Sequence, residues 1–213
     1  NLGDLMDSSG FGGSQGLGDG SSGLVIRGIN TSDQSGYQLA GVQDMNNDGF
    51  DELLIGARQA DPNGSNSGQA YIVFGFETTG TPELLLGSLD GTNGFTFNGV
   101  SANDRLGRSV DSLGDINGDG ISDIILSSYG DDDGGSDAGQ SYVVFGGMAN
   151  LGNLDAEDGT ADGTIELSEL LAANVGDGSK GFVITGGAAG DTSGWSAKGA
   201  GDINGDGLQD LII

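Results

Sequence analysis

The chain has 213 residues, with 45 glycines, 2 prolines and a net charge of −26 from 32 acidic and 6 basic residues. This acidic balance argues against binding to nucleic acid or to an anionic membrane surface. The sequence contains no cysteine and no histidine, which excludes disulfide bonds, structural zinc sites of the usual kind, and thiol or imidazole catalysis.

The first segment, residues 1–22, carries little pattern and is predicted to be a linker or the end of a preceding repeat. Its start, Asn1–Leu5, is similar to Asn150–Leu154, which follows a predicted strand at Tyr142–Phe145. We therefore expect residue 1 to follow an equivalent strand. The chain starts without Met and shows no signal peptide, so we expect a processed piece of something longer. No apolar run has the length of a membrane span.

From residue 19 onward the sequence repeats itself. A shift of 71 residues carries Gly36 onto Gly107 and Asp44 onto Asp115, and a further shift of 87 residues carries Asp115 onto Asp202. Self-similarity of this kind marks a propeller, a solenoid or an array. The predicted units are residues 23–93, residues 94–180 with an insertion around 149–178, and a truncated third repeat at 181–213.

Each repeat supplies four candidate strands. In the first repeat they are Leu24–Arg27, Tyr37–Val42, Leu53–Ala57 and Ala70–Phe74, and turn-rich segments separate them. Short apolar runs between glycine-rich turns predict an all-β protein, and four strands per repeat is the content of a propeller blade.

A nine-residue loop lies between the second and third candidate strands of every repeat. Side chains with oxygen atoms occupy positions 1, 3, 5 and 9, glycine occupies position 6, and position 7 can offer its carbonyl, which is the ligand order of a calcium loop. The predicted Ca²⁺ ligands are Asp44, Asn46, Asp48, Phe50 and Glu52 in the first loop, Asp115, Asn117, Asp119, Ile121 and Asp123 in the second, and Asp202, Asn204, Asp206, Leu208 and Asp210 in the third.

The alternative for each loop is a plain turn that joins two strands. Three copies in register favour calcium, because three carboxylates in one small loop repel each other unless a cation lies between them. In an EF-hand a helix would follow the loop, whereas here an apolar run such as Ile124–Leu126 predicts a buried strand. We therefore predict a calcium site between two strands.

These features together resemble the FG-GAP repeat of integrin α-subunit β-propellers and their bacterial relatives, over residues 23 to 213. The resemblance rests on the Gly-Tyr or Leu-Gly start, the D-x-N-x-D-G loop, Gly56-Ala57 after it and the Tyr-x-Val-Phe-Gly strand. It implies four-stranded antiparallel blades around a central axis, with calcium between the first two strands of a blade. The sequence departs from the pattern at Ser127-Ser128, which replaces Gly-Ala, and at Glu52, which is one methylene longer than aspartate.

Two further acidic segments could hold metal. Asp131-Asp132-Asp133 with Asp137 is flanked by glycine and serine, which favours a solvated hairpin tip. The insertion fits an EF-hand loop in part, with weak candidate ligands at Asp158, Thr160, Asp162, Thr164 and Glu169. The segment from Ile165 to Val175 could be the helix that follows such a loop, or a linker equivalent to Pro82–Leu89.

Some residues recur in register without forming a loop. Asp33, Asp104 and Asp191 precede the strand that enters each loop, which favours a turn or cap role over catalysis. Trp195 occupies the position of Tyr37 and Arg108 and is expected to pack between blades. Arg105 and Arg108 are expected to neutralise acidic neighbours.

We therefore expect an extracellular, calcium-binding adhesion or scaffold module that interacts with proteins or surface glycans. Two alternatives stay open: a structural subunit of an extracellular filament or surface layer, built from further copies of the chain, and a non-catalytic propeller part of a secreted hydrolase. We predict no catalytic residue and no enzymatic activity, because the recurring carboxylates have structural explanations and Asp155 and Glu157 lie in a linker. No nucleic acid partner and no membrane insertion are expected.

Overall fold

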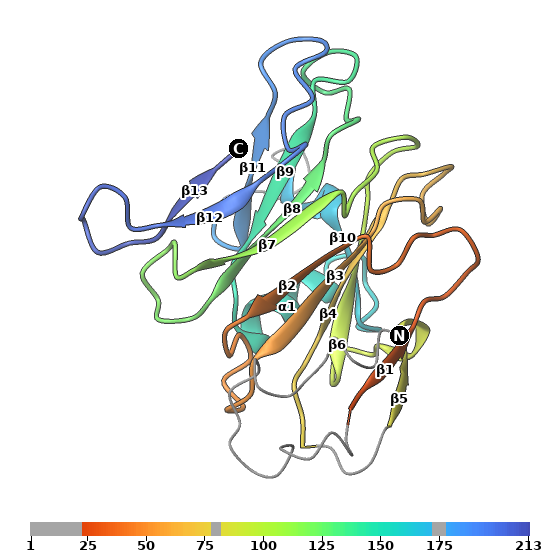
Figure 1. The fold of residues 1–213 in the computed structure, drawn as a ribbon, viewed down its shortest axis with the longest axis vertical. Helices are drawn as coiled ribbons and strands as arrows, with labels where there is room; N and C mark the ends of the chain where they lie inside the picture. Colours follow the sequence, from red (N-terminus) through yellow and green to blue (C-terminus); the bar gives the residue numbers. More distant parts are fainter. Residues whose placement is uncertain (1–22, 78–81, 172–177) are drawn as a thin grey trace.

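The computed structural model describes residues 23–77, 82–171 and 178–213. It consists mainly of short β-strands in antiparallel sheets, as the sequence predicted (Figure 1). The expectations for residues 1–22 fall outside the described residues. In the part that the structure describes, no helix is long and apolar enough to cross a membrane.

The first large sheet is built from the first repeat and the start of the second. Four of its strands are antiparallel and the last is parallel to its neighbour; in spatial order they are β2 (Gln38–Val42), β3 (Glu52–Ala57), β4 (Gln69–Val73), β6 (Gly94–Asn98) and β10 (Thr164–Glu166). The bounds of β2, β3 and β4 agree with the predicted strands within one residue at each end.

The second large sheet repeats this arrangement. Its antiparallel strands are β7 (Ser109–Gly114), β8 (Asp123–Ser128), β9 (Gln140–Val144) and β11 (Gly181–Thr185). Two smaller pairs complete the set of strands: β12 (Lys198–Gly201) with β13 (Asp210–Ile212), and β1 (Val25–Arg27) with β5 (Glu83–Leu85), which run parallel.

The hydrogen-bonded sheets are offset from the sequence repeats. The fourth strand of the first sheet is β6, which lies in the second repeat, and the fourth strand of the second sheet is β11, which lies in the third. The first large sheet therefore takes three strands from the first repeat and two, β6 and β10, from the second, whereas the second large sheet takes three from the second repeat and one from the third. The chain links neighbouring sheets through the fourth strands β6 and β11.

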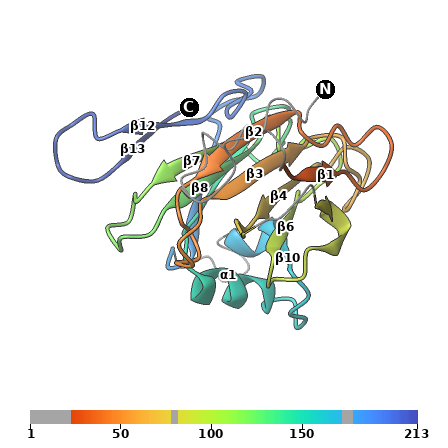
Figure 2. The same cartoon turned by 60° about the horizontal axis from the view of Figure 1, so that its bottom comes forward.

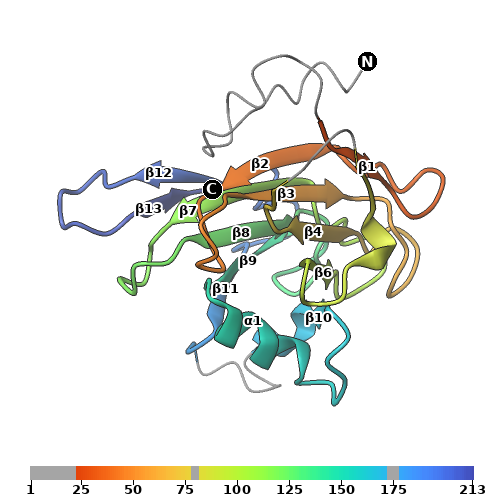
Figure 3. The same cartoon turned by 90° about the horizontal axis from the view of Figure 1, so that it is seen from below.

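The main core lies between the two large sheets. Leu54, Ile72 and Phe97 face Leu126 and Tyr142 across it, and all of these side chains are fully buried. The inner strands β2 and β7 lie close together (Figure 3). A Cβ atom on Gly56 would lie 2.1 Å from the carbonyl oxygen of Gly107, so the sheets meet there backbone to backbone.

The insertion forms a helix that covers the outer side of the core. Helix α1 (Met148–Asp155) lies next to the outer strands β10 and β11, away from β2 and β7 (Figures 2 and 3). Its side chains Leu151 and Leu154 are buried in the main core. This helix was not predicted from the sequence.

The second half of the insertion, as far as residue 171, is a linker and not an EF-hand helix. Strand β10 leads into a 3₁₀-helix, η3 (Leu167–Leu170), just as β5 leads into η2 (Leu86–Ser88). The helical alternative for Ile165 to Val175 is therefore wrong up to residue 171, and residues 172–177 lie outside the described part.

Candidate calcium loops and their supports

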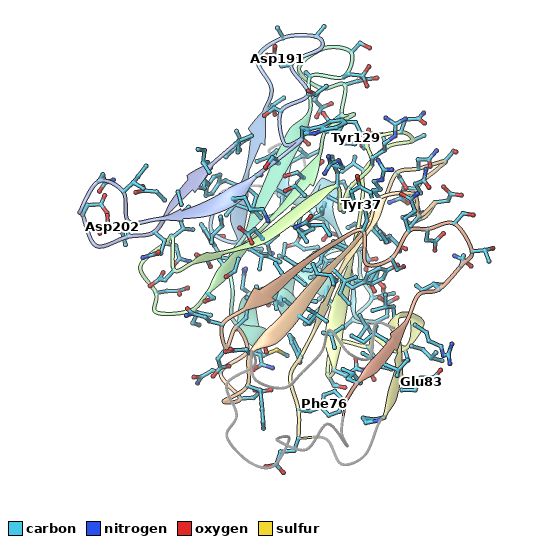
Figure 4. The ribbon with its side chains drawn as sticks, viewed as in Figure 1. Tyr37, Phe76, Glu83, Tyr129, Asp191 and Asp202 are labelled. Carbon is cyan, nitrogen blue, oxygen red and sulfur yellow. The ribbon has the colours of Figure 1, made fainter. Side chains whose placement is uncertain are left out.

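The β2–β3, β7–β8 and β12–β13 hairpins carry the three predicted loops at their tips. In each loop the acidic and amide side chains at positions 1, 3 and 5 lie together. In the second loop Asp115 accepts hydrogen bonds from the backbone N–H groups of Gly118 (2.6 Å) and Gly120 (2.8 Å). Asn117 Nδ2 donates to Asp119 Oδ2 at 3.0 Å. The position-5 acids Asp48, Asp119 and Asp206 are exposed, whereas Asp44 and Asp115 at position 1 are half-buried. Figure 4 shows Asp202 in the third loop.

The other two loops repeat this arrangement. Asp44 Oδ2 accepts from Gly49 N–H at 3.0 Å, and Asp202 Oδ2 accepts from Gly207 N–H at 2.9 Å. The residue at position 7 donates its N–H to the carboxylate at position 5 in every loop, for example Phe50 to Asp48 at 2.9 Å. The three sequence copies therefore fold into one local structure.

The acid at position 9 has a different environment. Asp123 is fully buried, and its two oxygens accept hydrogen bonds from the N–H groups of Ile116 (2.9 Å) and Gly146 (2.8 Å). Glu52 is also fully buried and accepts from Met45 N–H at 2.7 Å and Gly75 N–H at 3.4 Å. This acid fastens the start of the loop to the segment that follows the next strand.

Burial changes the protonation of these two acids. It raises the pKa of Glu52 to about 7 and that of Asp123 to about 6, although the backbone N–H groups oppose the rise. The charges of Asp119 and Asp115 add to the rise for Asp123, and the charge of Asp48 does so for Glu52. The position-9 carboxylate therefore lies close to the acids at positions 1 and 5.

The glycine after the following strand supports each of the first two loops, a role that was not predicted from the sequence. A Cβ atom on Gly146 would lie 2.3 Å from the carbonyl oxygen of Ser122, and one on Gly75 would lie 2.4 Å from that of Asp51. Only glycine fits against the loop while donating its N–H to the position-9 acid. The recurring Phe-Gly pair at Phe74-Gly75 and Phe145-Gly146 was the available signal.

The donors of these loops fit calcium by their chemistry. All are oxygen atoms, three of them carboxylate groups in each loop, and Ca²⁺ prefers such hard ligands. Among the described residues no three carboxylates are yet gathered around one point, since the position-9 oxygens turn toward backbone N–H groups. In the third loop Asn204 Nδ2 lies 3.4 Å from Asp210 Oδ1, which links positions 3 and 9 directly.

The insertion loop gathers part of its predicted ligand set. Asp158 Oδ1 accepts from Thr160 N–H and Oγ1–H, and Asp162 Oδ1 accepts from Thr164 N–H at 3.0 Å. Burial raises the pKa of Glu169 to about 7, and the charges of Asp158, Glu166 and Asp155 add to the rise. Calcium binding here stays a prediction.

The recurring acids before each loop-entering strand act as turn caps, as predicted. Asp33, Asp104 and Asp191 each accept the N–H of the residue three positions earlier, at 3.1, 2.7 and 2.9 Å.

The expectation for Arg105 and Arg108 was wrong. Arg108 lies over the rings of Trp195 (4.4 Å) and Tyr37 (5.2 Å), and Arg105 lies over Tyr129 (5.3 Å). Neither forms an ion pair with a described carboxylate, whereas Arg27, Lys180 and Lys198 do. The side chain of Trp195 meets Tyr129 edge-on at 4.8 Å and stays half exposed. These basic groups therefore stack on rings and leave the nearby acids without a cationic partner.

Comparison with known proteins gives the family. The family model for the FG-GAP repeat matches residues 35–73 and 106–144, which span β2–β4 and β7–β9 with their loops. The chain contains FG-GAP repeats. It is 30% identical to integrin alpha-IIb of Mus musculus over 187 residues and 28% identical to integrin alpha-5 of Xenopus laevis over 185 residues. Each alignment covers 84% of the chain.

A third relative matches a shorter part. Integrin alpha-2 of Mus musculus is 33% identical over 95 residues, which is 45% of the chain. The FG-GAP chain spans 14% of the length of integrin alpha-5 and of integrin alpha-IIb. The similarity therefore concerns one part of these much longer proteins.

Proposed function

We propose that this FG-GAP chain is a calcium-stabilised adhesion or scaffold module of the cell surface or extracellular matrix, with proteins or surface glycans as partners. Homology to integrin α subunits supports the adhesion role. The observation that carries the calcium role is the common loop structure, in which the acids at positions 1 and 5 lie together at the tip of each hairpin and, in the first two loops, the acid at position 9 is buried. Closure of the sheets into a complete propeller, with further blades, belongs to the same proposal.

Calcium has a mechanical role in this proposal. Each loop joins two neighbouring strands whose apolar residues form the core, so an ion that holds the loop also holds the hairpin. The position-7 carbonyls of Phe50, Ile121 and Leu208 complete the proposed ligand sets. Calcium that binds only the folded state raises the stability of the module. The surface that the module presents to a partner therefore stays folded.

Calorimetry tests the calcium part. Chelator-treated protein is titrated with Ca²⁺ and compared with Asp44→Ala, Asp119→Ala and Asp206→Ala, which each remove the position-5 or position-1 carboxylate of one loop. We expect each variant to bind one ion fewer than the unchanged chain. Equal stoichiometry in all four proteins would contradict the proposal.

Adhesion is tested with beads that carry the protein. The beads are applied to arrays of extracellular-matrix proteins and of glycans, in calcium and in chelator. Retention that requires calcium and is lost in the loop variants supports the proposal, whereas equal retention in chelator contradicts it. Turnover of a glycan, ester or phosphodiester that is lost on mutating an acid outside the loops would contradict the proposed absence of catalysis.

A further inference from the structure

A cluster of buried polar side chains lies at the end of β8 and β9 that is opposite to the calcium loops. Ser128 ends β8 and pairs with Gln140 at the start of β9, and Tyr142 lies two residues further along β9 on the same face. Their exposed fractions are 0%, 1% and 0%. Among the described residues, Ser128 Oγ, Gln140 Oε1 and the Tyr142 hydroxyl have no hydrogen-bond partner.

Two buried carboxylates flank these unpartnered atoms. Asp104 comes from the connection between β6 and β7, and Asp131 from the loop between β8 and β9; they are 3% and 4% exposed. The backbone joins the two segments, since Gly130 N–H donates to the Asp104 carbonyl at 3.1 Å. Burial raises the pKa of the Tyr142 hydroxyl, and the charges of Asp131 and Asp104 add to the rise, so this hydroxyl lies close to both carboxylates.

The first repeat supplies an internal comparison. There Ala57 and Ala60 stand at the positions of Ser128 and Asp131, and both are buried. The hydroxyl of Tyr71, the equivalent of Tyr142, donates to Gln69 Oε1 at 2.8 Å, so the polar atoms satisfy each other. In the second repeat Gln140 instead donates its Nε2 to Thr185 Oγ1 at 3.1 Å and to Asp133 Oδ2 at 3.3 Å, and its Oε1 is left free for another ligand.

The charge of this cluster is not offset by the protein. Neither Asp104 nor Asp131 is in an ion pair with a described basic residue, and the nearest arginines stack on aromatic rings. Burial raises the pKa of Asp104 to about 7, and the charge of Asp131 adds to the rise. Buried carboxylates are ordinarily paired with a cation or a metal ion.

We propose that this cluster is a further calcium site, buried against the face of the second sheet and separate from the hairpin loops, with ligands from Asp104, Asp131, Ser128, Gln140 and Tyr142. Two carboxylates and three neutral oxygens form a hard, all-oxygen donor set with the charge that one Ca²⁺ requires. The carboxylates alone do not gather in threes, so the neutral oxygens complete the site. The sequence predicted a solvated hairpin tip at Asp131, but the side chain of Asp131 is buried.

Terbium luminescence tests the site. Tb³⁺ is an oxygen-seeking ion of the calcium type, and it emits when a tyrosine or tryptophan in contact with it absorbs light. The proposed site contains Tyr142, whereas the hairpin loops contain only Phe50 as an aromatic residue. Chelator-treated protein should show emission excited through the tyrosine band that saturates as a single site and falls when Ca²⁺ is added.

The decisive variant installs the residues of the first repeat. In Ser128→Ala/Asp131→Ala the emission should fall by about tenfold or more, and Asp104→Asn should weaken it as well. Asp137→Asn is the matched control, because it removes one exposed charge from the same loop, and it should leave the emission unchanged. Asp119→Ala should also leave it unchanged while removing one loop ion in calorimetry, so this test is independent of the proposed loops.

A melting comparison confirms that the double variant folds. In chelator Ser128→Ala/Asp131→Ala should melt at a higher temperature than the unchanged chain, because it removes a buried, unpaired carboxylate; in calcium the difference should shrink or reverse. Tyrosine-excited emission that is absent in the unchanged protein, or that persists in the folded double variant, would overturn the proposed site.

Discussion

At the scale of single residues, the acids of one calcium loop have two separate roles. Asp119 at position 5 is exposed and its carboxylate accepts only the N–H of Ile121 and the amide of Asn117. Asp123 at position 9 is buried and holds two backbone N–H groups from separate segments. In the proposed calcium site the position-5 acid would serve the ion alone, whereas the position-9 acid also holds the fold together without it.

Two alanine variants should separate these roles. Asp119→Ala should lower the melting temperature only when calcium is present. Asp123→Ala should lower it in chelator too, because each buried N–H left without a partner costs about 1–3 kcal/mol. Melting curves of both variants with calcium and with chelator check this prediction. An equal loss for the two variants in chelator would contradict it.

The glycine that supports the second loop gives another prediction. Gly146→Ala should destabilise the protein by about 1–3 kcal/mol, because the new Cβ atom would lie 2.3 Å from the carbonyl oxygen of Ser122. Gly152→Ala is the matched control: it lies in helix α1 and its Cβ would have no neighbour within 4 Å. The control should stabilise slightly, since alanine favours a helix. Urea unfolding measures both free energies.

At the scale of strands and helices, β6 joins the two sequence repeats and carries the residues on which the main core depends. Phe97 is fully buried and lies in register with Ala70 on β4 and with Ile165 on β10. Asn98 next to it donates to Glu166 Oε1 at 2.6 Å. Strand β6 thus connects the sheet to the insertion.

Truncating this core residue should be costly. Phe97→Ala should reduce the free energy of unfolding by about 3–5 kcal/mol, through lost burial and a residual cavity. Phe76→Ala removes the same ring from a position that is 44% exposed, and should change stability by less than about 0.5 kcal/mol. Denaturant titration compares them. Similar losses for both variants would show that β6 does not organise the core.

The elements differ in how far the sequence predicted them. The recurring strands of the repeats and the backbone of the three loops were predictable because their apolar runs, glycines and acids recur in register. Strands β5 and β10 were not, because their short segments were interpreted as linkers. Helix α1 was not, because Met148–Asp155 contains Gly152 and two asparagines and so has weak helix propensity; it forms because Leu151 and Leu154 reach the core. The stacking of Arg108 on Trp195 was also missed, since charge alone suggested an acidic partner.

At the scale of the whole molecule, charge repulsion opposes folding wherever calcium does not offset it. The chain carries −26, and its described ion pairs are only three: Arg27–Glu83, Lys180–Glu157 and Lys198–Asp111. Like charges at this density destabilise a compact state. The proposed calcium would therefore act on the molecule in two ways, as a link between strands and as a counter-charge.

Salt should replace only the counter-charge effect of calcium, and not its effect as a link between strands. In chelator, raising NaCl to about 1 M should increase the melting temperature, because the screening length falls to about 3 Å. Calcium at about ten times its dissociation constant should add roughly 1.4 kcal/mol for each loop site even at high salt. Melting curves at low and high salt, with calcium or chelator, test both effects. If calcium no longer raises the melting temperature in high salt, the ion acts only as a counter-charge and does not link the strands.

The offset between repeats and sheets also determines how the protein responds to tension, which matters for an adhesion module. Force applied along the chain through the second repeat reaches β6, which is held by β4 of the first sheet, and β7, which is held by β8 of the second. We therefore expect that the second repeat is not released alone, because its release requires β6 to separate from β4 of the first repeat and β9 to separate from β11 of the third. The sequence repeat is therefore not expected to be the unit that unfolds under force, because each large sheet contains strands of two repeats.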